Sequence, residues 1–179
     1  MIIGNSLLAP TPWLSNEVIK EIEKFLTQKK HPKILEFGSG CSTLFFATYL
    51  PAHLVSVEHN PKWFEFMQNY IKEHNLQVDL RLVMHNHDQV CGQFEPHYFD
   101  FILIDSKDRM ACLKAIRDYN IVKPGGIVML DDSDMRQKYV IANEIMQGWQ
   151  KFESTGLKGN PLNPLEEFKI GTTTWWVNL

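Results

Sequence analysis

Five short runs of β-forming, mostly apolar residues alternate with segments of helical character through the middle of the chain. The apolar runs are Lys33–Phe37, Leu54–Glu58, Val78–Met84, Phe99–Asp105 and Gly126–Leu130. Capping residues and helical periodicity predict helices at Asn16–Lys30, Ser42–Leu50, Pro61–His74, Asp108–Val122 and Asp134–Trp149. Strands that alternate with helices are typical of parallel strands joined by crossover connections. The order therefore predicts an α/β fold with a doubly wound, mostly parallel sheet.

The last thirty residues break this alternation. A stretch rich in glycine and proline, "GLKGNPLNPLEEF", precedes the β-rich run "TTTWWVN" with no helix between them. We therefore expect a C-terminal strand pair over residues 150–179 that adds an antiparallel last strand to the sheet. The chain length suits a single domain over residues 1–179, with an N-terminal helical segment at 1–32 and a core at 33–132.

Composition narrows the class of protein. The chain is 44% hydrophobic and 22% charged with a formal net charge of -3, so nucleic acid is an unfavoured partner. Three widely spaced cysteines form neither a disulfide framework nor a zinc pattern, which favours a reducing cytoplasm. The N-terminus lacks a basic leader, and no apolar run approaches the ~20 residues of a membrane span. We expect a cytoplasmic protein without membrane contact, and a homodimer stays open.

Acidic residues follow four of the five predicted core strands. They are Glu36, Glu58, Asp105 and the pair Asp131-Asp132. In open α/β sheets, ligands bind outside the carboxyl ends of the strands. A single acid in such a place is equally well a helix cap or a turn residue. Four acidic strand ends on one rim favour a binding site.

The stretch "ILEFGSGCST" ends the first strand in two glycines, Gly38 and Gly40, which permit a tight backbone turn. Glu58 follows Gly38 by twenty residues, the separation at which a carboxylate can bind both hydroxyls of a ribose lying over the glycine loop. A cofactor that contains a nucleoside is predicted. A dinucleotide-binding loop would carry a third glycine where Thr43 stands, which counts against a dehydrogenase.

Four motifs in order, "ILEFGSG", "VSVEHN", "FDFILID" and "VKPGGIVMLDD", resemble the class I S-adenosylmethionine-dependent methyltransferases over residues 33–132. The resemblance implies a Rossmann-like, three-layer αβα fold. It places Gly38, Ser39 and Gly40 against the methionine part of S-adenosylmethionine, Glu58 on the ribose, and Asn86 or a neighbour at the adenine. The full set of cofactor-binding residues that we predict is Glu36, Gly38, Ser39, Gly40, Ser42, Glu58, His59, Asn86 and Asp105.

The segments "FDFILIDSKDR" and "LDD" also resemble the metal-dependent O-methyltransferases of the catechol and caffeoyl-CoA type. That resemblance implies that Asp105, Asp131 and Asp132 hold Mg²⁺ or another divalent cation, a ligand set that suits hard cations. Two departures stand against it. Asp132 replaces the usual asparagine, and Lys107, the counterpart of the catalytic lysine, comes one position early. In the alternative, Asp105 serves the cofactor and the two later aspartates start a helix.

The predicted function is methyl transfer from S-adenosylmethionine to a small-molecule acceptor, at oxygen, with Asp105 and Lys107 as catalytic residues. A nucleic-acid or protein methyltransferase is an alternative. Methylation of base amino groups commonly uses an Asn/Asp-Pro-Pro-aromatic stretch, and this chain has "DSKD" at 105–108 instead. A non-catalytic scaffold of the same fold is the third hypothesis.

Overall fold

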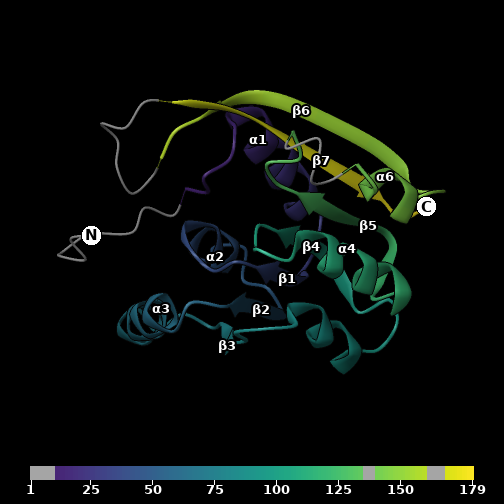
Figure 1. Ribbon diagram of the computed structural model, residues 1–179. Coiled ribbons are helices and arrows are strands. Elements are labelled where there is room, and N and C mark those ends of the chain that lie inside the picture. The colour runs from purple at the N-terminus through teal and green to yellow at the C-terminus, as the bar shows by residue number, and fades with distance from the viewer. Residues whose placement is uncertain (1–10, 135–139, 161–167) are drawn as a thin grey trace.

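The computed structural model describes residues 11–134, 140–160 and 168–179, and it contains a seven-stranded sheet in the order β3-β2-β1-β4-β5-β7-β6 (Figure 1). Strands β1 to β5 pair in parallel, whereas β7 runs antiparallel to both β5 and β6. The doubly wound sheet with an antiparallel last strand is confirmed. The strands are β1 (Lys33–Phe37), β2 (His53–Glu58), β3 (Asp79–Leu82), β4 (Phe99–Ile104), β5 (Val122–Leu130), β6 (Gln150–Lys158) and β7 (Lys169–Val177).

Helices cover both faces of the sheet, with α2 and α3 on one side and α4 and α6 on the other (Figure 1). Every residue of the central strand β4 is buried, which explains why its sequence is apolar except for Asp100, a carboxylate paired with Lys123. One core cluster packs α1 and α2 against the sheet, and a second packs α4 and α6 against the opposite face. The helices are α1 (Asn16–Leu26), α2 (Cys41–Ala47), α3 (Pro61–Glu73), the 3-10 helix η1 (His87–Gln93), α4 (Arg109–Asp118) and α6 (Ala142–Ile145).

Several helix boundaries differ from prediction. Of the predicted helix Asp134–Trp149, the structure describes Asp134, which lies in a turn, and residues 140–149, where only Ala142–Ile145 is helical. Gly148 follows with a positive φ of 88°, a conformation that glycine adopts readily and that ends the helical turns. Residues 135–139 of this segment, residues 1–10 and residues 161–167 lie outside the described residues. The 3-10 helix η1 has no predicted counterpart, because it buries only His87, Val90 and Cys91.

The parallel strands bring their carboxyl ends to one edge of the sheet, as the strand pattern predicted. The register pairs Phe37 at the end of β1 with Val57 on one side and Ile104 on the other. Ile104 in turn pairs with Leu130, so the residues that follow β1, β4 and β5 are close neighbours. The β6–β7 hairpin adds a second wall to this edge, because Lys158 at the end of β6 forms a β-bridge with Ser15 ahead of α1.

A candidate active site at the carboxyl edge of the sheet

Gly38 makes the turn out of β1 possible. Its φ is +104°, and a Cβ atom built on it would lie 2.4 Å from the backbone oxygen of Asp105. The chain after β1 therefore passes the chain after β4 at a distance that only glycine permits. Gly40 differs, because a Cβ atom there would meet no atom within 4 Å. The loop thus presents open space at Gly40, where a bound molecule would approach its backbone.

Glu58 lies beside this loop, as the spacing predicted. It is 3% exposed, and one carboxylate oxygen accepts hydrogen bonds from the Ser39 amide at 3.3 Å and the Ser39 hydroxyl at 3.0 Å. The other oxygen accepts from the backbone amides of His59 at 2.8 Å and Asn60 at 2.7 Å. These donors hold the carboxylate in place at the end of β2. A ribose hydroxyl can take the place of the Ser39 hydroxyl, which is a flexible donor.

Trp63, an aromatic residue of the predicted helix Pro61–His74, also supports the loop. The Trp63 indole Nε1 donates a hydrogen bond to the backbone oxygen of Ser39 at 2.8 Å. Trp63 stands in the first turn of α3, which Asn60 caps by accepting from the Lys62 and Trp63 amides. The helix start and the glycine loop are therefore joined. The Asn60-Pro61 cap was visible in the sequence, but the reach of the indole to Ser39 was not.

Glu36 is buried inside the site. Its carboxyl group accepts hydrogen bonds from the hydroxyls of Ser42, Thr43 at 2.5 Å and Ser56 at 2.8 Å. Burial raises the pKa of Glu36 to about 7, although the three hydroxyls oppose this shift. Glu36 and Ser42 thus contact each other within the predicted cofactor site. Thr43, which stands in the position of the third glycine, binds the Gly40 amide as well, at 2.9 Å.

Three of the residues near the predicted adenine site lie together on the loops after β2 and β3. The rings of His59 and His87 are 5.7 Å apart, and burial lowers the pKa of His87. Asn86, immediately before η1, is exposed with a left-handed φ of 55°. This conformation is uncommon outside glycine and is often found at functional loops. From the sequence, Asn86 or a neighbour is expected at the adenine and His59 at the cofactor, and in the structure the buried His87 lies beside them.

The acidic rim at the ends of β4 and β5 forms as predicted. Ligand oxygens of Asp105, Asp131 and Asp132 all lie within 4.8 Å of one another. Asp105 stands at the mouth with 40% of its side chain exposed, and Asp131 is buried. The enclosing cleft and the charge of Asp131 raise the pKa of Asp105 to about 6, while Arg109 opposes the shift. Arg109 forms ion pairs with Asp105 and, at 3.7 Å, with Asp132.

A lysine from the C-terminal hairpin also contacts this rim. Lys158 Nζ lies 2.5 Å from Asp131 Oδ1 and 2.7 Å from Asp132 Oδ1. Burial alone would lower the pKa of Lys158, but the two aspartates raise it above its ordinary value. The Thr173 hydroxyl donates to Asp131 Oδ1 as well, at 2.7 Å. A divalent cation does not fit these residues well, because Lys158 and Arg109 already neutralise the carboxylates that would bind it.

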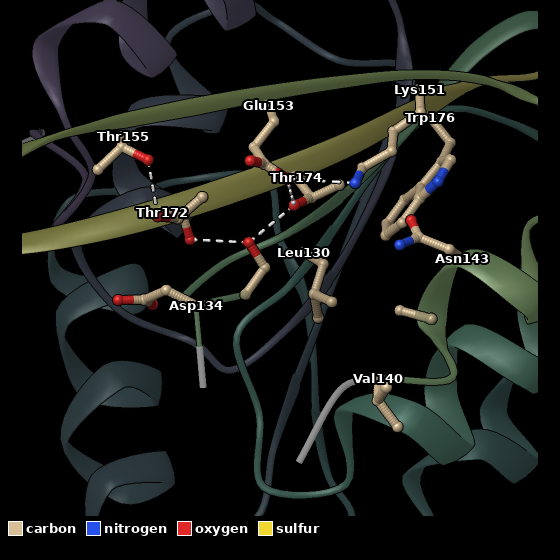
Figure 2. A pocket seen from close by; sticks show the side chains of 12 residues that line it. Leu130, Asp134, Val140, Asn143, Lys151, Glu153, Thr155, Thr172, Thr174 and Trp176 are labelled. Atoms are coloured by element: carbon tan, nitrogen blue, oxygen red, sulfur yellow. Dashed lines mark hydrogen bonds and ion pairs between the residues drawn. The ribbon is translucent and has the colours of Figure 1, made fainter. Parts of the chain in front are cut away.

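Two cavities open at this edge. The acidic cavity, of about 390 Å³, is lined by Trp13, Asp105, Asp131, Asp132, Asp134, Lys158, Lys169 and Ile170. The second, of about 360 Å³, has a wall of hydroxyl groups from β6 and β7 and faces α6 (Figure 2). Within it Thr155 and Thr172 share a hydrogen bond of 2.8 Å, as do Ser133 and Thr174. Asp134 lines both cavities, so they adjoin.

Lys107, the predicted catalytic lysine, is exposed in the turn between β4 and α4. It does not line either cavity, so the structure does not bring it to the acidic rim. Among the described residues, Arg109 and Lys158 form ion pairs with the rim. Arg109 follows Asp105 by four residues, a spacing that a sequence can reveal once the helix start is known. Nothing in the local sequence marks Lys158.

Comparison with known proteins identifies the family. A family model described as a methyltransferase domain matches residues 35–133, more than half of the chain. The chain belongs to this methyltransferase family. The match spans the glycine loop, Glu58 and the acidic rim, and with the sheet order it makes the protein a class I S-adenosylmethionine-dependent methyltransferase. No protein with a curated description matches the sequence.

Solved structures share the fold of this methyltransferase. An O-methyltransferase from Bacillus cereus in complex with SAH is 17% identical with a TM-score of 0.66, over 92% of this chain and 82% of that one. An O-methyltransferase from Streptomyces achromogenes in complex with SAM, involved in tomaymycin synthesis, is 16% identical with a TM-score of 0.63, over 93% and 82%. A tRNA (m1A58) methyltransferase from Aquifex aeolicus is 16% identical with a TM-score of 0.62, over 96% and 72%.

Proposed function

We propose that this methyltransferase transfers the methyl group of S-adenosylmethionine to an oxygen atom of a small-molecule acceptor. The proposal rests on one observation. The open glycine loop, the carboxylate of Glu58 that is fixed beside it, and the acidic rim all lie at the same edge of the sheet. The O-methyltransferases from B. cereus and S. achromogenes support the choice of oxygen.

Each part of the cofactor has proposed partners. The backbone of the loop Gly38-Ser39-Gly40 would bind the methionine part of the cofactor, with Ser42 and Glu36 behind the loop. Glu58 would bind the ribose hydroxyls. The adenine would lie towards His59 and Asn86. These residues belong to the proposed cofactor-binding core at 33–132, and the strand pair at 150–179 completes the rim within a single domain.

Asp105 is the proposed general base. As the acceptor oxygen attacks the methyl carbon, the bond from that carbon to sulfur breaks, and the acceptor proton passes to the Asp105 carboxylate. A pKa of about 6 leaves this group ionised at neutral pH yet more basic than an ordinary aspartate. Alignment of the reactants over the rim supplies much of the acceleration, on the order of 7–11 kcal/mol in favourable cases. Lys107 would act only after the turn that carries it moves.

The two adjoining cavities favour a small acceptor. Volumes of about 390 and 360 Å³ are in the range of small-molecule pockets. The rim contributes carboxylates and the formal net charge is -3, which disfavours a polyanion such as the substrate of the A. aeolicus enzyme. A polar acceptor whose far end reaches the hydroxyl wall of the second cavity fits best.

A cytoplasmic location is part of the proposal. Cys41, Cys91 and Cys112 are all free and buried, which suits a reducing compartment. Within the described residues no helix is long and apolar enough to cross a membrane.

Calorimetric titration with S-adenosylhomocysteine tests the cofactor site. We expect wild-type protein to bind it with a dissociation constant in the micromolar range. Glu58→Gln keeps the shape of the side chain but removes the charge, and should weaken binding about 10- to 100-fold, because a hydrogen bond to a charged group contributes about 1.5–3 kcal/mol. Glu65→Gln, an exposed change on α3, is the matched control and should bind as the wild type does. A folded wild type that does not bind would refute the proposal and favour the scaffold.

A further inference from the structure

A side chain of the protein itself, that of Lys158, contacts two of the three rim carboxylates. Lys158 Nζ contacts the Oδ1 atoms of both Asp131 and Asp132, at 2.5 and 2.7 Å. A Ca²⁺ or Mg²⁺ ion would need oxygen ligands at about 2.0–2.6 Å, drawn from these same atoms. The ammonium and the ion cannot both be ligated by them, because two cations would then be in near contact without water between them.

Three features hold the lysine in this position. Its backbone bridges to Ser15, so the end of β6 is anchored beside α1. Its stem passes over Gly171 on β7, where a Cβ atom would lie 2.6 Å from Lys158 Cε and 2.9 Å from Nζ. Only 4% of the side chain is exposed. The absence of a side chain at Gly171 thus lets the ammonium reach across β7 to the end of β5.

The two cations at the rim leave one of its three negative charges uncompensated. Asp105, Asp131 and Asp132 contribute three negative charges when ionised, and Lys158 and Arg109 contribute two positive ones. A single divalent cation on the three carboxylates would supply the same two positive charges. The protein therefore provides from its own chain the positive charge that an acidic rim of this kind otherwise takes from a metal ion.

We propose that Lys158 is a built-in cation that takes the place of a divalent metal at the acceptor cavity, so that this methyltransferase works without one. The ammonium group donates hydrogen bonds to Asp131 and Asp132, and Lys158 lines the acidic cavity together with Asp105. Its fixed positive charge would then stabilise the acceptor oxygen as that oxygen loses its proton to Asp105. This last role rests on the proposed function, whereas the exclusion of metal does not.

Titration with Mn²⁺, followed by the electron paramagnetic resonance signal of the free ion, tests the proposal on the full chain. Wild-type protein should leave the signal of the free ion unchanged up to about 1 mM. Lys158→Met keeps the length of the stem but removes the charge, and should bind Mn²⁺ at least about tenfold more tightly than the wild type. Lys158→Arg keeps the charge and should not bind the ion.

Lys151→Met is the matched control, since it removes the same charge from the opposite end of β6 and should behave as the wild type does. Mn²⁺ binding by the wild type at micromolar concentrations, or no gain of binding in a folded Lys158→Met, would overturn the proposal. If Lys158→Met does not fold, the wild type and Lys158→Arg still test the proposal, because Mn²⁺ binding by either of them would contradict it.

A second measurement separates this proposal from the assignment of the cofactor. Binding of S-adenosylhomocysteine to the wild type should be the same with EDTA as with Mg²⁺. Loss of binding in EDTA would count against a metal-free site. If the wild type binds S-adenosylhomocysteine under neither condition, the proposed methyl transfer is contradicted. The Mn²⁺ titration would still test the proposal about Lys158 independently.

Discussion

Substitution of Gly38 by alanine should destabilise the fold by about 2–6 kcal/mol. The new Cβ atom would lie 2.4 Å from the backbone oxygen of Asp105 and 2.9 Å from its carbonyl carbon, and neither atom can turn aside as a side chain would. Relief of such overlap in a packed region costs about 1–3 kcal/mol. A φ of +104° adds about 1–3 kcal/mol for a residue that has a Cβ atom. The loss falls at the junction of β1 and β4, in the centre of the sheet.

Gly40→Ala is the matched comparison on the same loop. Its Cβ atom would meet nothing within 4 Å, so the free energy of unfolding should change by less than about 0.5 kcal/mol. The affinity of the Gly40→Ala protein for S-adenosylhomocysteine should fall, because the alanine side chain would enter the space proposed for the methionine part of the cofactor. Urea denaturation and calorimetric titration measure the two effects. A Gly38→Ala protein as stable as the wild type would refute the close approach of the two strands described above.

Two further predictions concern residues around the loop. Because the pKa of Glu36 is about 7 in the folded protein and 4.5 ordinarily, the unfolded chain loses this proton first as pH rises. Folding stability should therefore fall between about pH 5 and pH 7 by up to about 3 kcal/mol and then level off, and urea denaturation of Glu36→Gln should lack this decline. Trp63→Phe removes the hydrogen bond to Ser39 and should weaken S-adenosylhomocysteine binding about three- to tenfold by calorimetry, at a cost in stability near 1 kcal/mol. Unchanged binding would show that the indole does not position the loop.

Residues that act through the backbone pattern were predictable from the sequence. Glu58 and Asp105 could be placed because parallel strands must end at one edge, and the apolar runs showed where each strand ends. Gly38 was predicted from the need for a tight turn, and the structure supplies the reason in the approach of Asp105. The strand pair at the C-terminus was also predicted, because no helix separates its two halves.

Residues that act through side chains from distant segments were not predictable. Lys158 reaches Asp131 only because β7 lies between β5 and β6, and that order cannot be read from a hairpin sequence. Trp63 looked like an apolar residue of a helix, since the direction of its indole depends on how α3 packs. The predicted helix Asp134–Trp149 is a separate case, because among its described residues only Ala142–Ile145 is helical and Gly148 follows with a positive φ.

The position of β7 between β5 and β6 also bears on how the site matures during synthesis. The acidic rim resides on strands that emerge from the ribosome early, whereas Lys158 follows Asp131 by 27 residues. Apart from the single bridge between Lys158 and Ser15, β6 pairs with β7 among the described residues, so it joins β5 only through β7. Until then Arg109 alone of the two rim cations offsets the repulsion among the carboxylates. Pairing of β7 with β5 therefore also brings Lys158 to the acidic rim, which couples docking of the β6–β7 hairpin to assembly of the site.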